Sequence, residues 1–295
     1  MRLRVVIALL SPGLFFSFFA LFFVDAAAAA AHDGDAYERH VAALRKRLPP
    51  GAFHIVVEKP FVVVGDGPAE DVRASAEGTV RWTVQRLKAL YFTKDPRQIL
   101  TIWLFKDRDS YRRNARRLFG EVPSTPYGYY SSGDRALVMN ISTGGGTLVH
   151  ELVHPFMEAN FEGVPAWFNE GLGSLYEQSA ERGGRIRGLT NWRLAGLQRL
   201  IARKAMPTFR KLLTSGDHAF YRDAIGDNYA QARYLCYYLQ ERGLLQRYYH
   251  AFHAAKDVDP TGYATLAKVL GLGSERAMRV FEQRFAAWVS TLEFP

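Results

Sequence analysis

The chain changes character at Gly144-Gly145-Gly146, and this change limits its fold more than any other feature of the sequence. Before the three glycines, short segments rich in β-branched and aromatic residues are bounded by turn residues, which is typical of strands. We expect strands over residues 53–58, 61–64, 99–105, 127–130 and 136–141. After the glycines, apolar residues recur at helical spacing and no convincing strand is expected. Helices are expected over residues 147–161, 165–178, 190–203, 227–242, 244–255 and 273–291.

The first half also contains helical patterns. Helices are predicted over residues 35–48, 70–92 and 107–119, with Asp107 as the N-cap of the last and Gly120 as its stop. The two strands nearest the glycines form a predicted hairpin turned at residues 131–134. This order predicts an α+β fold, in which a small mixed β-sheet with helices precedes a mostly helical C-terminal lobe.

The N-terminus resembles an export signal. Arg2 and Arg4 precede an uncharged apolar run over residues 5–24, and six alanines follow over residues 26–31. A basic start, an apolar stretch and a small-residue cleavage site describe a secretory signal peptide. A run of about 20 apolar residues is also long enough to remain as a membrane tether.

Both interpretations place the body of the protein outside the cytoplasm, in a periplasmic or extracellular location. The predicted organisation is therefore a signal peptide or membrane anchor over residues 1–31, an α/β lobe over residues 32–145 and a helical lobe over residues 146–295. The oligomeric state does not follow from the sequence.

Charge and cysteine content exclude some classes of function. The formal net charge is +9, which suits nucleic acid, anionic membranes, acidic envelope polymers or simply solubility. Export argues against nucleic acid as a partner. Cys236 is the only cysteine, so an intrachain disulfide and a thiolate metal cage are excluded. We expect Cys236 to be a small buried residue in its apolar run.

A candidate metal site begins directly after the glycines. His150-Glu151-Leu152-Val153-His154 has the pattern His-Glu-x-x-His. Residues four apart on a helix lie on the same face, so both imidazoles can reach one ion. Glu151 follows the first histidine by about 100° of helix rotation, beside the ion rather than on it. A carboxylate in that position can take a proton from water activated by the metal.

Glu170 is the candidate third ligand. Catalytic zinc normally has three protein ligands and an open position, and two histidines leave the site one short. Pro165 is suited to begin the next helix, which carries Glu170 among apolar and small residues. A carboxylate on such a face needs a partner. That partner is the metal or, alternatively, an arginine.

These residues resemble a known family. His150-Glu151-x-x-His154, followed 16 positions later by the Glu of Trp-Phe-Asn-Glu-Gly-Leu, is similar to the gluzincin group of zinc metallopeptidases, and most similar to exported bacterial peptidase-MA-like proteins. The resemblance covers roughly residues 53–245. It implies a zincin-like fold with the active-site helix between the two lobes, Zn²⁺ held by His150, His154 and Glu170, and Glu151 as general base.

The sequence departs from that family at two positions. Pro155 follows the second histidine and removes a helix hydrogen bond, so we expect a kink just after the site. Ser174 stands four residues after Glu170, where many gluzincins have a carboxylate that orients a ligand histidine. The residue that orients the histidine is therefore not identified by the sequence.

Tyr229 is a further candidate catalytic residue. It lies in an amphipathic helix similar to one that packs against the site in the same family, where its hydroxyl could donate to the oxyanion. The alternative is a core tyrosine among the 15 in the chain. We also expect the strand over residues 136–141 to border the cleft and to bind an extended peptide through main-chain hydrogen bonds.

The sequence thus predicts a zinc-dependent peptidase that acts on a peptide or protein substrate. The alternative is a non-catalytic, envelope-associated binding protein on the same scaffold. The intact His-Glu-x-x-His motif favours the enzyme, because a non-catalytic relative would be expected to lose Glu151 first.

Overall fold

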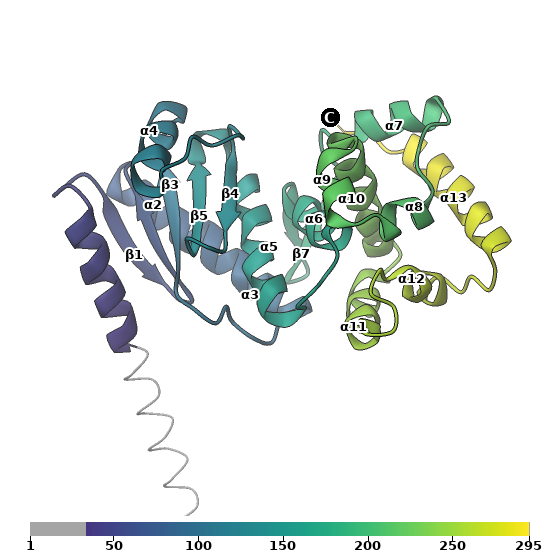
Figure 1. Cartoon of the computed structure of the whole chain (residues 1–295), viewed down its shortest axis with the longest axis horizontal. Coiled ribbons are helices and arrows are strands. Elements are labelled where there is room, and N and C mark those ends of the chain that lie inside the picture. Colours follow the sequence, from purple (N-terminus) through teal and green to yellow (C-terminus); the bar gives the residue numbers. More distant parts are fainter. Residues whose placement is uncertain (1–33, 295) are drawn as a thin grey trace, which may run out of the picture. The chain divides into compact units, whose positions relative to one another are not determined.

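The computed structural model describes residues 34–294 (Figure 1). The predicted signal peptide or membrane tether, over residues 1–31, lies outside the described residues. Residues 34–47 form a helix that ends before Pro49, as expected, and the compact unit that carries the rest of the fold begins at Gly51. Among the described residues, no helix combines the length and apolar character needed to cross a bilayer.

A five-stranded mixed sheet forms the first part of this unit. Its order is β1-β2-β3-β5-β4, with β2, β3 and β5 parallel and both outer strands antiparallel to their neighbours. Every residue of the three parallel strands is buried, which explains their continuous apolar sequences. The strands are β1 (His54–Glu58), β2 (Phe61–Gly65), β3 (Leu100–Phe105), β4 (Gly128–Ser131) and β5 (Ala136–Asn140).

The predicted strands and hairpin are confirmed, but one expectation about the sheet is wrong. The sequence predicts that the strand over residues 136–141 binds an extended peptide through main-chain hydrogen bonds, which requires a free edge. This strand is instead β5, which pairs with β3 on one side and β4 on the other. Because β4 pairs only with β5 among the described strands, the free edge on this side of the sheet belongs to β4.

Helices complete the first part. The helix predicted over residues 70–92 is observed as α2 (Ala69–Ala74), a π-helical stretch (Ser75–Arg81) and α3 (Trp82–Leu90). The next helix, α4 (Arg108–Phe119), begins and ends as predicted. The Asp107 side chain accepts a hydrogen bond from the Ser110 amide at 2.7 Å, and Gly120 closes the helix with a φ of 79°.

The rest of the unit is mostly helical. In Figure 1, α5 lies between the sheet and the later helices, and it contacts both β4 and β5 on one side and α6 on the other. Helix α10 packs against α6 and buries Cys236, as expected. The helices are α5 (Gly146–Asn160), α6 (Ala166–Tyr176), α7 (Leu194–Ala202), α8 (Phe209–Thr214), α9 (Asp217–Arg222), α10 (Ile225–Glu241), α11 (Leu245–Ala255), α12 (Tyr263–Val269) and α13 (Glu275–Ser290).

The expectation that no strand follows the glycines is also wrong. A short antiparallel hairpin, β6 (Ser179–Arg182) and β7 (Arg185–Gly188), follows α6. Its turn uses Gly183 and Gly184, both with positive φ. The structure is a mixed α+β fold, and the division into lobes at residues 145 and 146 remains a prediction.

Candidate metal centre

The start of α5 depends on a glycine. The helix begins at Gly146, where an added Cβ would overlap the backbone carbonyl oxygen of Glu177. Only a glycine lets the first turn of α5 pass this close to the end of α6. The helix then continues through Pro155 to Asn160, so the proline does not end it.

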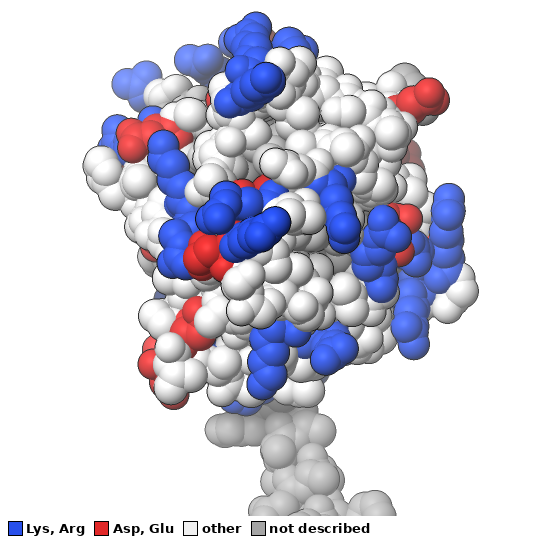
Figure 2. Space-filling model, turned by 90° about the vertical axis from the view of Figure 1, so that its right-hand side faces the viewer, with Lys and Arg blue, Asp and Glu red and all other residues white. Residues whose placement is uncertain are grey.

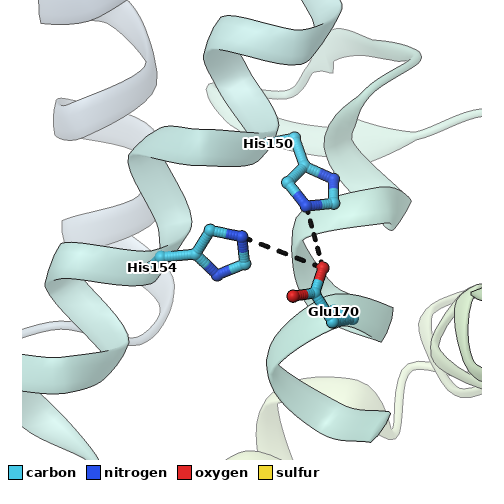
Figure 3. Close-up of side chains that lie close together, drawn as sticks. All are labelled: His150, His154 and Glu170. Carbon is cyan, nitrogen blue, oxygen red and sulfur yellow. Dashed lines mark hydrogen bonds and ion pairs between the residues drawn. The ribbon is translucent and has the colours of Figure 1, made fainter. Parts of the chain in front are cut away.

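His150, His154 and Glu170 converge, as predicted (Figure 3). The Glu170 Oε2 atom lies 3.0 Å from His150 Nε2 and 3.8 Å from His154 Nε2. Donor atoms at tetrahedral positions around zinc, with bonds of 2.0–2.1 Å, are separated by about 3.3 Å, so these spacings suit one ion. The three residues are only 5%, 9% and 6% exposed, respectively.

The other ring nitrogen of each histidine is also held. His150 Nδ1 lies 3.0 Å from Glu177 Oε1, and His154 Nδ1 lies 3.0 Å from Asn169 Oδ1. An Nδ1–H that donates to each oxygen leaves both Nε2 atoms facing Glu170, where each can act as a ligand. Each of the two candidate ligand histidines is therefore oriented by a side-chain oxygen that accepts from its Nδ1–H.

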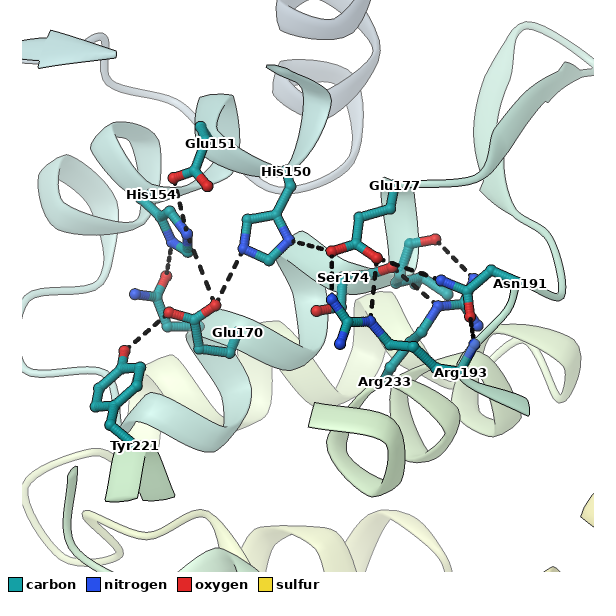
Figure 4. A network of polar contacts seen from close by, with 12 residues as sticks. His150, Glu151, His154, Glu170, Ser174, Glu177, Asn191, Arg193, Tyr221 and Arg233 are labelled. Atoms are coloured by element: carbon teal, nitrogen blue, oxygen red, sulfur yellow. Dashed lines mark hydrogen bonds and ion pairs between the residues drawn. The ribbon is translucent and has the colours of Figure 1, made fainter. Parts of the chain in front are cut away.

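Glu177 belongs to a wider polar network (Figure 4). Arg193 donates to its two carboxylate oxygens at 2.9 and 3.2 Å, and Asn191 donates at 3.3 Å. Although burial opposes ionisation, the hydrogen bonds from His150 and Arg193 lower the pKa of Glu177. The carboxylate that orients His150 is thus charged and fixed in place.

The residue that orients His150, which the sequence did not identify, is Glu177. Ser174, where the family resemblance places a carboxylate, is buried, and its Oγ has no hydrogen-bond partner among the described residues. Glu177 is three residues further on, about one helical turn, and so reaches the same face of the helix.

The ionisation of the ligands follows from their contacts. Burial lowers the pKa of His150, but the hydrogen bonds to Glu170 and Glu177 outweigh it and raise the pKa well above its usual range. For Glu170, burial acts in the opposite direction from its two histidine neighbours, and the histidines prevail, lowering its pKa to about 2. Without metal, the Glu170 carboxylate is therefore ionised, and the protonated ring of His150 balances its charge.

Glu151 lies beside the three converging residues. It is 9% exposed, and its Oε2 is 3.7 Å from His154 Nε2. It lines the same cavity as the two histidines. Glu151 can therefore reach a water molecule or substrate near the candidate metal position without serving as one of the three ligands.

Two tyrosines complete the surroundings of Glu170. The Tyr221 hydroxyl, which the sequence analysis did not identify, donates to Glu170 Oε1 at 2.8 Å. Tyr229 lines the cavity, packs on Phe220 with ring centroids 5.3 Å apart and lies next to the Arg193 guanidinium. Burial, followed by the charge of Glu170, raises the pKa of both hydroxyls, so both remain protonated donors.

No protein-family model and no curated protein matches the chain. Its chemistry is therefore inferred from the site itself.

The site opens into a cavity of about 1290 Å³. The free-edge strand β4 forms one wall, and α5, α6, α9 and the start of α10 contribute the others. The ring of Tyr130, on β4, stacks on the ring of His154 with their centroids 6.5 Å apart, so this wall lies close to the candidate metal position.

The alternative partner for Glu170, an arginine, is not observed. Among the described residues, Glu170 interacts with two imidazoles and with the hydroxyls of Tyr221 and Tyr229, and no arginine forms an ion pair with it. A buried group of two imidazole nitrogens and one carboxylate oxygen, open to a cavity, could hold a divalent metal ion.

Proposed function

We propose that this protein is a zinc-dependent peptidase. The observation that carries the proposal is the convergence of His150, His154 and Glu170 at the base of a cavity, with the Glu151 carboxylate beside them. Two nitrogen ligands and one oxygen ligand with a free position favour zinc over magnesium or calcium, which prefer oxygen. When bound, the ion polarises a carbonyl group and makes water acidic enough to ionise near neutral pH.

The protein residues have distinct roles in this proposal. Glu151 accepts a proton from the attacking water and then donates it to the leaving amine. The Tyr229 hydroxyl donates to the carbonyl oxygen as negative charge develops there. Tyr221 instead holds Glu170 through its 2.8 Å hydrogen bond, and Glu177 fixes the ring of His150.

Substrate binding fits the free edge of β4. Unpaired main-chain groups on an edge strand can form hydrogen bonds with an extended peptide. Four residues of β4 and its ends, Gly128, Tyr129, Tyr130 and Ser132, line the cavity. The predicted export signal supports a periplasmic or extracellular substrate.

Replacing Glu151 by glutamine tests the proposal. The E151Q variant should bind about one zinc ion per chain, as the wild type does, because Glu151 is not one of the ligands. It should lose cleavage of an unfolded protein substrate by at least about 100-fold, since general-base catalysis contributes roughly 10²–10⁴-fold.

Metal content and proteolysis of both proteins, with and without a chelator, give the answer. Undiminished cleavage by E151Q would remove Glu151 from the mechanism. Stoichiometric metal without any cleavage by the wild type would instead support the alternative, a non-catalytic binding protein that uses the same metal group.

A further inference from the structure

The charge of the cavity is opposite to that of the protein. The chain has 38 Lys and Arg against 29 Asp and Glu, and basic side chains are prominent on the face seen in Figure 2. In the cavity lining this balance is reversed. Among the described residues that line the cavity, Arg193 is the only arginine and there is no lysine, whereas five glutamates contribute: Glu151, Glu158, Glu162, Glu170 and Glu177.

Three of these glutamates already have a role. Glu170 belongs to the candidate ligand group, Glu151 lies beside it, and Glu177 pairs with Arg193 at 2.9 Å. The carboxylates of Glu158 and Glu162 form no ion pair with a Lys or Arg among the described residues; Lys256 reaches only the backbone carbonyl of Glu162, at 3.4 Å. Two exposed carboxylates therefore remain available to a ligand.

Their position places them at one end of the cavity. Glu158 is four residues beyond His154 on α5, so it lies on the same face, about 6 Å further along the helix axis. Glu162 follows the end of that helix. The opposite end, beyond His150, contains the paired Arg193 instead. The two lining carboxylates that have no basic partner among the described residues thus lie on one side of the candidate metal position.

An aromatic side chain lies against the Glu158 carboxylate. The Tyr130 hydroxyl donates to Glu158 Oε2 at 2.8 Å and fixes this carboxylate against β4. Aromatic faces attract Lys and Arg cations and also pack against their aliphatic stems. A carboxylate beside a tyrosine therefore suits a basic side chain.

We propose that the cavity selects peptides with a Lys or Arg side chain on the Glu158 side of the scissile bond, and that Glu158 is the residue that recognises it. This inference rests on the proposed peptidase function. An extended peptide on the β4 edge would place successive side chains along α5, so only one side of the scissile bond would face Glu158.

Binding can be measured separately from catalysis. Zinc-loaded E151Q would be titrated into fluorescent peptides that differ at one position, with Lys, Gln or Glu placed in turn on each side of a bond that the wild type cleaves. We expect Lys to bind about threefold to tenfold more tightly than Gln on one side only, and Glu to bind more weakly there. Fluorescence anisotropy gives the dissociation constants.

A second substitution assigns the preference to Glu158. In the E151Q background, E158Q should remove most of the preference for Lys, because glutamine keeps the size and the hydrogen-bond acceptor for Tyr130 but not the charge. The matched control is E293Q, an exposed glutamate outside the cavity, which should leave the preference intact. A preference that survives E158Q, or equal binding of Lys and Gln peptides, would overturn the inference.

Cleavage by the wild-type protein separates this inference from the proposed function. If the zinc-loaded wild type cuts no bond in an unfolded protein substrate, the peptidase proposal fails, and the inference with it. If peptides are cut at equal kcat/KM whether they contain Lys or Gln, the peptidase proposal stands and the inference alone is wrong. Faster cleavage of the Lys peptides, lost in E158Q, supports both.

Discussion

His150 contacts a carboxylate through each of its ring nitrogens, Glu177 on one side and Glu170 on the other. Its ring also rests over Gly173, where an added Cβ would be 3.1 Å from Nε2. The position of the ring therefore depends on the absence of a side chain at Gly173 as well as on the carboxylates of Glu170 and Glu177. A ligand fixed in this way loses little conformational entropy when metal binds.

Removal of the Glu177 side chain should weaken metal binding. Loss of a group that orients a ligand histidine typically costs 10-fold to 100-fold in affinity, so we expect E177A to bind zinc about 10–100 times more weakly than the wild type. E177Q, which keeps an acceptor oxygen for His150, should recover part of this loss. Competition with a chromogenic chelator measures the affinity.

S174A is the matched control for Glu177. The hydroxyl that this variant loses is buried and has no hydrogen-bond partner in the part of the chain that the structure describes, so zinc affinity should not change. An equal loss of zinc affinity in S174A and E177A would show that the end of α6 affects zinc binding only through its packing.

Replacing Tyr229 and replacing Tyr221 should change different quantities, kcat and zinc affinity respectively. Y229F should lower kcat by about 10²–10³-fold with little change in zinc affinity, if its hydroxyl stabilises charge that develops in the transition state. Y221F should instead lower zinc affinity, because it frees Glu170 Oε1 from its donor. Steady-state kinetics at saturating zinc, together with zinc titration, test both; the opposite result would exchange the roles of the two residues.

The sequence was sufficient for some residues of the site and not for others. The spacing of His150, Glu151 and His154 on one helix determines their relative positions, and Glu170 follows from the need for a third ligand. Glu177 and Tyr221 have no such signal. One acts from the last turn of its helix and the other from a six-residue helix, so only the packing of these elements in three dimensions reveals them.

At the scale of elements, a close helix contact involves another glycine of α6. A Cβ at Gly171 would lie 3.0 Å from the Ala232 carbonyl oxygen and 3.1 Å from Cys236 Sγ, both on α10. The absence of a side chain at Gly171 thus lets α6, the helix that carries Glu170, pack closely on α10. The low helix propensity of glycine is offset here by this close approach.

Alanine at position 171 should therefore destabilise the fold. We expect G171A to lower the free energy of unfolding by about 1–3 kcal/mol, since the neighbouring backbone cannot yield easily to the added methyl group. The control is G196A in α7, where the nearest atom to the new Cβ is the Arg199 Nη2 at 3.9 Å. That substitution should be neutral or stabilise by up to about 1 kcal/mol. Urea denaturation compares them; equal effects would contradict the packing argument.

The length and the apolar pattern of a helix or strand decide whether the sequence predicts it. Buried parallel strands such as Phe61–Gly65 are continuous apolar runs, and the longer helices show apolar periodicity over several turns. The β6–β7 hairpin has neither property: Ser179–Arg182 and Arg185–Gly188 are short, charged and only partly buried. The three missed helices, α8, α9 and α12, have six or seven residues, too few to establish a period.

At the scale of the whole molecule, the candidate metal position lies between two helices that pack on each other and on different parts of the fold. Helix α5 also contacts the sheet, whereas α6 also contacts α9 and α10. Two candidate ligands come from α5 and one from α6, so a bound ion would strengthen the link between these two helices. Metal should then stabilise the native protein in proportion to its affinity for it.

Zinc should accordingly raise the melting temperature of the chelator-treated protein. At a free concentration of about 100 times the dissociation constant, the gain is roughly 2.7 kcal/mol. With an unfolding entropy of about 2.1 cal/mol/K per residue, that corresponds to a rise of about 4–5 °C for a protein of this size. H154A should lose the rise, and magnesium should not replace zinc, because it prefers oxygen ligands. Differential scanning fluorimetry suffices, and a full zinc-induced rise in H154A would contradict the assignment of the ligands.

The same rise should depend on pH in a defined direction. Because the pKa of His150 is raised in the metal-free protein, its proton stabilises the fold fully below the unfolded pKa, and this stabilisation is lost as pH rises through the folded pKa. Zinc requires the neutral ring, so it must displace that proton. Lowering the pH from about 8 to about 6 therefore stabilises the metal-free reference and weakens zinc binding, and both effects reduce the rise. A zinc-induced rise that stayed constant over this range would show that His150 releases no proton when the ion binds.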